Sequence, residues 1–591
     1  MKPLTDILEQ RISKAIHAVT GQGGCPALVR VSTDAKFGDY QANGVMAAAK
    51  KTKTNPRQLA EQIVAELKLD DICEPPEIAG PGFINLRLKD SFLAERLLTM
   101  NADSDRLGID KTAVPQTVVV DYSGPNIAKQ MHVGHLRSTI IGDCIARLYD
   151  FEGHTVIRQN HIGDWGLQFG MLIAYIEYRG KLALKGQVTY VIPNSLSEFE
   201  QFYVEAKKLF DTDKSFQKRS REATVGLHTG DKTWLGRWEL LVVHSKKHYQ
   251  SIYEVLNVTL TDNDVRGESF YDSMLTDIVE SLKSKGLATE SEGAMCIFPE
   301  GFKNKDGDPL PFIIQKSDGA FLYATTDLAA LQFRINELKA DKIIYVTDAR
   351  QAQHFQMLFA TAKLAGWVDD NIQLEHVTFG TMLGTDGKPF KTRTGGTVKL
   401  KDLLEEAVQR AAAVVEEKNP DLPAEQKAEI AKAVGTGAVK YADYSNNRNS
   451  DFVFSFDKML AMEGNTAPYM QYAYARIKSI ERKAAGKVDI KSELADVTSL
   501  AFTDEAEKDL AKMLIRYDQA IAAAANECRP NYLTGYLYDL AQAFSRFYNA
   551  CPVLKADAVQ RPVRLLLCDL TARTIKHGLS ELLGIEVVEQ M

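Results

Sequence analysis

The chain has 591 residues, of which 45% are hydrophobic and 25% charged, and its formal net charge is −7. These values are typical of globular proteins, and the length exceeds what one hydrophobic core organises, so we expect three or four domains. The negative charge argues against a generic nucleic-acid coat, although an RNA enzyme with local, shape-specific contacts stays open.

The seven cysteines form no CxxC pair, which favours neither a disulfide framework nor a structural zinc site. Reduced thiols fit the cytoplasm, where we expect the protein. The first 22 residues are amphipathic and mixed in charge, without the apolar core of a signal peptide. No stretch approaches 18 apolar residues, so we expect no membrane span.

Residues 1–110 are predicted to form a separate small α/β domain. Its expected elements are helices at 3–19 and 56–69, a strand at 28–31, and a strand that follows the Gly/Pro turn within 78–88. Between them, the stretch 36–43 is both polar and aromatic. A surface turn and an RNA-contacting loop explain this stretch about equally well.

The next segment has the pattern of a strand, a turn and a helix. The β-branched run 118–120 predicts a buried parallel strand, and Gly, Pro and Asn at 124–126 mark a turn. Apolar residues at helical spacing then predict a helix over 136–149. In a doubly wound sheet this junction binds phosphates, because free backbone N–H groups and the positive end of the helix dipole point at the ligand.

Two histidines stand at the start of this helix. His132 and His135 can donate hydrogen bonds to phosphate oxygens, and Gly134 between them leaves room for a nucleotide. Three interpretations compete: ordinary helix-start residues, a zinc pair, and the HxGH signature of class I aminoacyl-tRNA synthetases and their relatives. In this composition an HxGH match is expected by chance roughly 0.01 times. No neighbouring residue completes a zinc ligand set, so we expect no metal site in the protein.

Alternating strands and helices continue after this helix. The expected elements are strands at 155–160, 312–315, 342–348 and 375–380, helices at 325–338 and 353–366, and a Gly-rich loop at 161–166. Strand–helix alternation with β-branched strands predicts a parallel sheet. Residues from about 176 to 310 break the pattern and are interpreted as a largely helical insertion between two halves of the sheet.

The last third of the chain is predicted to be almost entirely helical from about residue 400. Before it, residues 383–396 concentrate Gly, Lys, Thr and Arg, which suits either a mobile basic loop or a solvated turn. Aromatic residues gather at 468–476 and 536–548. At helical spacing they are more often core residues, but tyrosines beside arginines also suit stacking on unpaired bases.

Taken together, the chain resembles a class I arginyl-tRNA synthetase of the bacterial type over nearly its whole length. The motifs that carry the resemblance are 123–139, 37–41, 161–166, 388–393 and 463–472. The resemblance implies an α/β fold with a Rossmann-like (HUP-type) parallel-sheet catalytic domain, a small N-terminal α/β domain and a C-terminal all-α helical bundle. The implied boundaries are 1–110 for the domain that contacts the tRNA elbow, 116–400 for the catalytic domain with its insertion at about 176–310, and 401–591 for the connector and anticodon-binding helices.

The resemblance also implies a two-step reaction. L-arginine and ATP give arginyl-adenylate and pyrophosphate, and arginine then passes to the 2′-hydroxyl of the terminal adenosine of tRNA(Arg). We expect Mg²⁺ to accompany ATP without a dedicated protein site, activation to need bound tRNA, and the protein to be a monomer. Two rivals stay open: a ligase for another amino acid, and a catalytically silent RNA-binding regulator.

Residue roles follow from the resemblance alone. The region of the HxGH motif, the first signature of the class, comprises Pro125, Asn126, Ile127, Ala128, Lys129, Gln130, Met131, His132, Val133, Gly134 and His135. ATP contacts are implied for His132, Gly134, His135, Gly384 and Lys391. Lys391 belongs to a second loop that departs from the class pattern KMSKS, and the alignment of Lys388 and Pro389 with that pattern stays open. Lys129 is implied to compensate for this departure, so the expected catalytic residues are Lys129, His132, His135 and Lys391.

Substrate contacts are implied in the same way. Arginine is expected to meet Asn126, Glu268, Tyr323, Asp327 and Gln353. Without the family, Tyr323 and Asp327 would be interpreted as a helix-start pair at i and i+4. The tRNA is expected to meet Phe37, Tyr40, Asn43, Tyr469, Tyr472 and Met591.

Overall fold

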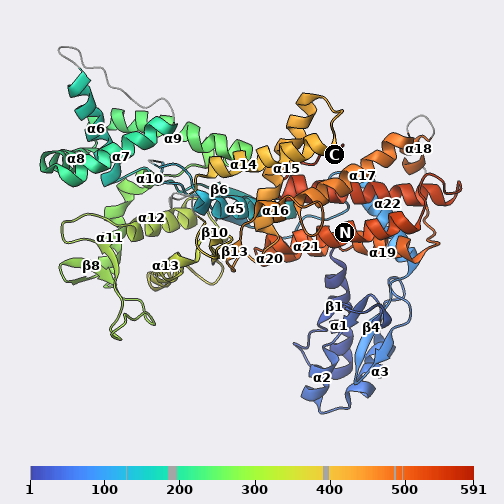
Figure 1. Cartoon of the computed structure of the whole chain (residues 1–591). Coiled ribbons are helices and arrows are strands. Elements are labelled where there is room, and N and C mark those ends of the chain that lie inside the picture. The colour runs from blue at the N-terminus through green and yellow to red at the C-terminus, as the bar shows by residue number, and fades with distance from the viewer. Residues whose placement is uncertain (1, 128, 184–195, 391–397, 485–487, 496) are drawn as a thin grey trace. The chain divides into compact units, whose positions relative to one another are not determined.

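The computed structural model describes the chain except for residues 1, 128, 184–195, 391–397, 485–487 and 496 (Figure 1). The described residues divide into two compact units. One unit contains residues 1–111, 462–581 and 586–591, and the other contains residues 112–461 and 582–585. Among the described helices, none combines the length and the apolar character that crossing a membrane requires.

A four-stranded parallel sheet organises the second unit. Its strands are β5 (Thr117–Asp121), β6 (Thr155–Gln159), β10 (Lys342–Asp348) and β11 (Gln373–Phe379), in the order β11-β10-β5-β6. Val119 of β5 pairs with Ile343 of β10 on one side and with Ile157 of β6 on the other. The parallel sheet predicted from strand–helix alternation is therefore confirmed.

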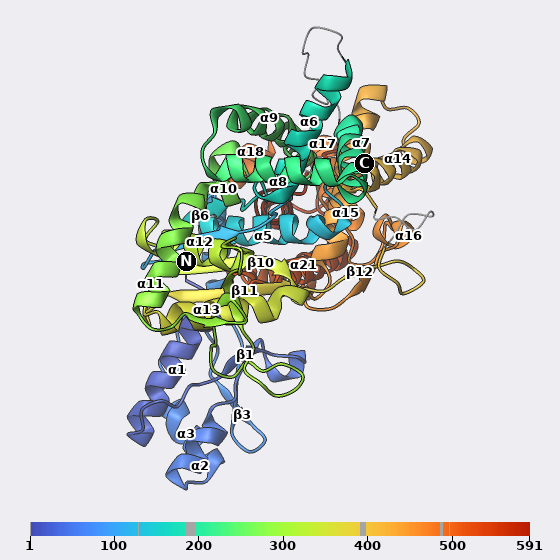
Figure 2. The ribbon, with the colours of Figure 1, turned by 90° about the vertical axis from the view of Figure 1, so that its left-hand side faces the viewer.

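The strand order places a switch point between β5 and β10. Helix α5 (Val133–Glu152) leads from β5 to β6, and α13 (Ala352–Leu364) leads from β10 to β11 in the opposite direction. Right-handed crossovers in opposite directions put the two helices on opposite faces of the sheet, as Figure 2 shows. The carboxyl ends of β5 and β10 thus open into the crevice where doubly wound sheets bind ligands.

One predicted strand belongs to a different sheet. Residues 312–315 form β9, but β9 pairs antiparallel with β8 (Ala294–Ile297), which pairs with β7 (Thr289–Ser291). Its expected place in the parallel sheet is therefore wrong. The burial of β9 alternates, with Phe312 buried and Ile313 39% exposed, which is typical of an antiparallel strand with one solvated face.

Helices surround the sheet of the second unit (Figure 2). The insertion contains α6 (Leu167–Ala183), α7 (Leu196–Thr212), α8 (Lys214–His228), α9 (Lys232–Val255), α10 (Glu268–Tyr271) and α11 (Leu275–Ser284). The remaining elements are α12 (Tyr323–Asn336), β12 (Met382–Leu383), α14 (Leu400–Lys418), α15 (Ala424–Tyr444), β13 (Phe452–Val453) and α16 (Phe456–Met459). Apolar residues of α11, α12 and α13 pack on Val119 and Ile343 of the sheet and form one continuous core.

The first unit combines a small α/β part with a helical bundle. Its sheet has the order β1-β2-β4-β3, with β1 (Val29–Val31), β2 (Tyr40–Ala42), β3 (Glu77–Ala79) and β4 (Phe83–Leu86). The helices beside it are α1 (Leu4–Thr20), α2 (Val45–Thr52), α3 (Pro56–Glu66) and α4 (Asp90–Ala102). The bundle contains α17 (Ala467–Ala484), α18 (Ile490–Ala495), α19 (Glu505–Leu514), α20 (Tyr517–Asn526), α21 (Pro530–Ala550) and α22 (Gln560–Lys576). The predicted helical C-terminal bundle is confirmed.

Candidate active site

The turn after β5 is held by a buried hydrogen-bond network. Ser123 and Gly124 adopt positive φ angles of 72° and 50°, which costs a non-glycine residue free energy. The Ser123 N–H donates to Ser138 Oγ at 2.9 Å, and the Ser138 hydroxyl donates to the Val346 carbonyl at 2.6 Å. These bonds connect the turn to α5 and to β10, so the surrounding structure maintains its conformation.

Two motifs that are separate in the sequence meet beside this turn. Asn126 and Gly163 form a parallel bridge, flanked by hydrogen bonds from the Ile127 N–H to the Gly163 carbonyl and from the Gly163 N–H to the Pro125 carbonyl. A Cβ on Gly163 would lie 3.1 Å from the Asn126 side-chain nitrogen. The close approach explains why glycine occupies the loop at this point, and it places Asn126 at the carboxyl edge of the sheet.

The two histidines cap α5 and each other. His132 Nδ1 accepts from the Gly134 N–H at 3.0 Å, and His135 Nδ1 accepts from the His132 N–H at 3.0 Å. Burial lowers the pKa of His135 to about 3 and also lowers the pKa of His132, so both rings are neutral at physiological pH. A neutral ring whose Nδ1 accepts carries its proton on Nε2. Capping therefore leaves each histidine with an Nε2–H donor.

The chain after the second signature loop is bonded to the first signature. The Val133 N–H donates to the Val398 carbonyl at 3.1 Å, and the Leu400 N–H donates to the Met131 carbonyl at 3.0 Å. Residues far apart in sequence therefore meet at the start of α5.

The described part of the second loop begins with a tight turn. The Gly384 N–H donates to the Lys388 carbonyl at 2.7 Å, and Leu383 forms an antiparallel bridge with Pro389. Lys391, which the resemblance singles out, lies outside the described residues, as does Ala128 of the first signature.

Three of the five residues expected around arginine come together. Asp327 Oδ2 lies 2.6 Å from His354 Nε2. Burial, together with the negative charges of Asp164 and Asp327, raises the pKa of Glu268 to about 8. Burial and the charges of Glu268 and Asp327 also raise the pKa of Tyr323. Glu268 lies near enough to Asp327 for their charges to interact, and we call these two residues the acidic cluster. Tyr323 stands one turn before Asp327 on α12, with 69% of its surface exposed.

Two further residues expected at the site, Gln353 and Lys129, are exposed. Gln353 is exposed near the start of α13, directly before His354. Lys129 is exposed, with its ammonium 5.5 Å from the centre of the Tyr203 ring.

Sequence reasoning missed three polar residues of the site. His354 and Asp164 border the acidic cluster, and Arg350 contributes to lowering the pKa of His132. Arg350 follows β10 and donates twice to the Asp348 carboxylate at 2.8 Å. Its position at the carboxyl end of a predicted strand was the available signal, because ligand contacts gather there.

Tyr40 does not fit direct contact with RNA. It is fully buried, its hydroxyl accepts from Gln519 Nε2 at 2.9 Å, and the Arg516 guanidinium lies 5.4 Å from its ring centre. The neighbouring Asp39 pairs with Lys512 at 2.9 Å. We therefore correct the expected role of Tyr40: its side chain joins β2 to Arg516 and Gln519 at the start of α20 in the same unit.

The other expected tRNA contacts have some exposure. Phe37, Asn43, Tyr469 and Met591 are half-buried, and Tyr472 is 40% exposed. The Tyr469 hydroxyl accepts from Gln542 Nε2 at 3.0 Å, which orients that ring within the bundle.

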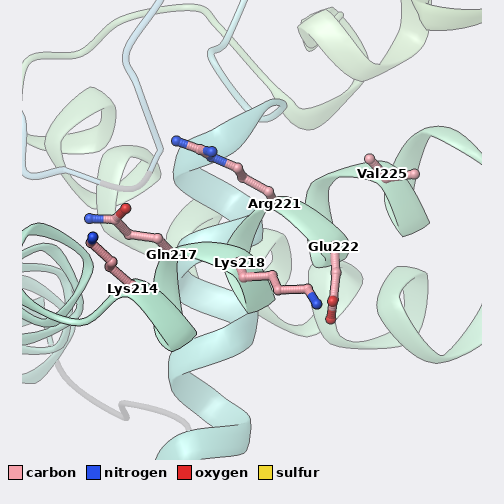
Figure 3. A pocket seen from close by; sticks show the side chains of 6 residues that line it. All are labelled: Lys214, Gln217, Lys218, Arg221, Glu222 and Val225. Atoms are coloured by element: carbon pink, nitrogen blue, oxygen red, sulfur yellow. The ribbon is translucent and has the colours of Figure 1, made fainter.

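A shallow hollow of about 560 Å³ lies on α8 of the insertion (Figure 3). Its lining residues are Lys214, Gln217, Lys218, Arg221, Glu222 and Val225. Three of these side chains are basic and one is acidic, so the hollow suits an anionic partner.

The chain matches three family models. They are the arginyl tRNA synthetase N terminal domain over residues 6–88, the catalytic domain of tRNA synthetases class I (R) over 99–456, and the DALR anticodon binding domain over 470–591.

Full-length relatives agree with these models. An arginine–tRNA ligase of Cellvibrio japonicus is 52% identical over 590 residues, which cover 100% of both chains. The solved arginyl-tRNA synthetases of Plasmodium falciparum and Thermus thermophilus superpose with TM-scores of 0.84 and 0.80 at 31% and 26% identity, each over 100% of both chains. With the catalytic model matching more than half of its length, the chain belongs to the class I arginyl-tRNA synthetase family.

Proposed function

We propose that this arginine–tRNA ligase binds ATP at the start of α5 and binds arginine at the acidic cluster beside it. In the reaction, an arginine carboxylate oxygen attacks the α-phosphorus of ATP, and pyrophosphate leaves with its bonding electrons. The 2′-hydroxyl of the terminal adenosine then attacks the arginyl carbonyl, and AMP leaves. The observation that carries the assignment is that the Asn126–Gly163 bridge joins the segment before His132 to the loop whose Ile162 carbonyl accepts from the Glu268 N–H.

ATP is held by donors whose protonation does not change near neutral pH. The Nε2–H groups of His132 and His135 and the N-terminus of α5 would donate to phosphate oxygens. Because both rings are uncharged before ATP binds, they add hydrogen bonds without changing the net charge of the site. Lys129, Gly384 and Lys391 are proposed to complete this contact, and Mg²⁺ to arrive on the ATP phosphates.

Arginine is held by carboxylates. Asp327 and an ionised Glu268 would pair with the planar guanidinium, which carries five N–H donors, and Tyr323 would lie beside them. Asn126 and Gln353 are proposed to orient the α-amino and carboxylate groups. Without arginine, ionisation of Glu268 beside Asp164 and Asp327 is unfavourable, and a cation of matching shape would stabilise the ionised form.

The remaining roles concern tRNA and the cell. Phe37 and Asn43 of residues 1–110 are proposed to touch the tRNA elbow. Tyr469, Tyr472 and Met591 are proposed to meet the anticodon loop. The enzyme is proposed to act as a cytoplasmic monomer.

Aminoacylation assays test these assignments together. Purified chain, ATP, magnesium and total tRNA are incubated with each of the twenty amino acids, and ATP–pyrophosphate exchange and aminoacyl-tRNA are measured. Of the twenty amino acids, we expect only arginine to support both activities. We expect ATP–pyrophosphate exchange only when tRNA is present. Charging with another amino acid would overturn the arginine pocket, and tRNA binding without charging would favour the silent RNA-binding regulator.

Substitution of Lys129 by alanine should slow adenylate formation more than it weakens arginine binding. The exposed ammonium stands three residues before His132, where it can approach phosphate oxygens, whereas the acidic cluster lies across the Asn126–Gly163 bridge. We expect the exchange rate to fall about tenfold with an arginine KM within about twofold. An unchanged exchange rate would remove Lys129 from the catalytic group, and Lys129→Arg should retain most of the activity.

Arginine affinity should increase as the pH rises from about 7 to about 8.5. The pKa of Glu268 is about 8 in the arginine-free protein, so its carboxyl group is mostly protonated at neutral pH. Since the guanidinium pairs with the ionised form, the arginine KM should fall about eightfold over this interval. The KM is measured with saturating ATP and tRNA. Glu268→Gln should flatten the profile, and a native KM that stays constant or rises would contradict the role of Glu268.

A further inference from the structure

A group of four side chains joins the insertion helices to the loop beside the acidic cluster. Asp272 Oδ1 accepts from Trp165 Nε1–H at 3.0 Å and lies 2.9 Å from His228 Nδ1. His228 is the last residue of α8. Trp238 of α9 donates its Nε1–H to the Asp164 carbonyl at 2.7 Å. We call Trp165, His228, Trp238 and Asp272 the tryptophan clamp.

The aromatic rings of the clamp pack edge to face. The Trp165 ring lies 5.4 Å from the Trp238 ring and 5.5 Å from the His228 ring, at interplanar angles of 89° in both cases. Such contacts add to the hydrogen bonds and restrict the ring of Trp165 from two sides. Helices α8 and α9 therefore determine the position of residues 164 and 165 together.

The opposite side of the same loop holds Glu268. The Glu268 N–H donates to the Ile162 carbonyl at 3.1 Å, and a Cβ on the preceding Gly267 would lie 2.2 Å from Asp164 Oδ2. The buried Asp164 carboxylate accepts from the N–H and the hydroxyl of Ser269, at 2.9 Å and 2.7 Å. The loop thus contacts the backbone of Glu268 through Ile162 and fixes its short helix α10 through Asp164.

We propose that Asp272, His228 and Trp238 are positioning residues for arginine recognition, acting on Glu268 through residues 164 and 165. The inference rests on the proposed function, because Glu268 affects arginine only if arginine binds beside it. The clamp contacts no reacting atom in this scheme. Its effect should appear in the arginine KM, since a carboxylate displaced from the guanidinium loses a directional, charge-assisted hydrogen bond.

Paired substitutions of Asp272 test the proposal on the full chain, with ATP and tRNA saturating. Asp272→Ala removes the nearer of the two acceptors around Trp165 Nε1–H, the other being His228 Nδ1 at 3.2 Å, and it also removes the partner of His228. It should raise the arginine KM about tenfold while the ATP KM stays within about twofold. Asp272→Asn keeps an oxygen that accepts from Trp165, so its arginine KM should stay within about threefold of the native value. Trp238→Phe, which loses the donor to Asp164 and part of the ring that packs on Trp165, should raise the arginine KM by about threefold or more.

A matched control comes from the same insertion. Asp211, on α7, is exposed and pairs with Lys207 of the same helix. Asp211→Ala makes the same chemical change without touching the clamp and should leave the arginine KM unchanged.

Three results would overturn the proposed positioning role of the clamp. They are an unchanged arginine KM in both Asp272→Ala and Trp238→Phe, equal losses for arginine and ATP, and an asparagine variant as impaired as the alanine variant. If Asp272→Ala does not fold, Trp238→Phe and His228→Gln carry the same comparison. A native chain without arginine-dependent exchange would overturn the proposed function itself, whereas normal native activity with unaffected variants would overturn the clamp alone.

Discussion

Replacement of Asp327 by asparagine is expected to raise the arginine KM about 100-fold, which corresponds to about 2.7 kcal/mol of lost binding free energy. The two side chains have nearly the same shape, so the change removes a negative charge with little change in packing. Asp327 forms the acidic cluster with Glu268, and the guanidinium would lose one of its two carboxylate partners. A buried donor left without an acceptor adds to the loss.

Steady-state kinetics with varied arginine and with varied ATP separate this effect from general damage. The ATP KM should stay within about twofold, because Asp327 is assigned to arginine alone. His354→Gln is the matched control, since Asp327→Asn also alters the 2.6 Å contact with His354. We expect this control to change the arginine KM only by about threefold. A near-normal arginine KM in Asp327→Asn would refute the assignment.

Replacement of His132 by asparagine is expected to slow adenylate formation about 100-fold, because one hydrogen-bond donor to the developing charge is lost. Asparagine is among the best N-cap residues, so its side-chain oxygen should still accept from the Gly134 N–H. Its amide is too short to replace the Nε2–H of the imidazole. The variant therefore removes the proposed ATP contact while keeping the cap.

Thermal unfolding and exchange rates together separate the two roles of His132. The asparagine variant should unfold within about 2 °C of the native chain, whereas His132→Ala should lose about 1 kcal/mol of stability because the cap is gone. Both variants should show the same rate loss and an arginine KM within about twofold of the native value. A normal exchange rate in His132→Asn would mean that the histidine only caps α5.

The local elements of the catalytic fold were predictable from the sequence. The run 342–348 was expected as a strand and forms β10 with the same limits, and the helix expected at 136–149 lies within α5. These features depend on residues close in sequence: β-branched residues suit a buried strand, and apolar residues at helical spacing suit a packed helix. The histidine pair was visible for the same reason, since a cap and its helix are neighbours.

Pairing between distant segments was not predictable in this way. Residues 312–315 have a strand composition, yet their partner is β8, because the choice between two sheets depends on contacts that local periodicity does not contain. Tyr40 looked like a surface ring, yet it is buried, and its contacts are with Arg516 and Gln519, far away in the sequence. Local pattern specifies an element, whereas its burial depends on what the rest of the chain brings to it.

The same distinction between local pattern and distant contacts applies to the active site. By itself the sequence indicated the family and the sheet type and proposed the donors to ATP, because short motifs and the alternation of strands and helices are visible in residues close in the chain. Only the tertiary structure decided that Glu268 lies near Asp164 and Asp327, and that helices α8 and α9 hold the loop beside it. The reason is electrostatic and steric: the pKa of a carboxyl group and the position of a side chain depend on neighbours in space, and those neighbours lie up to about a hundred residues away in the chain.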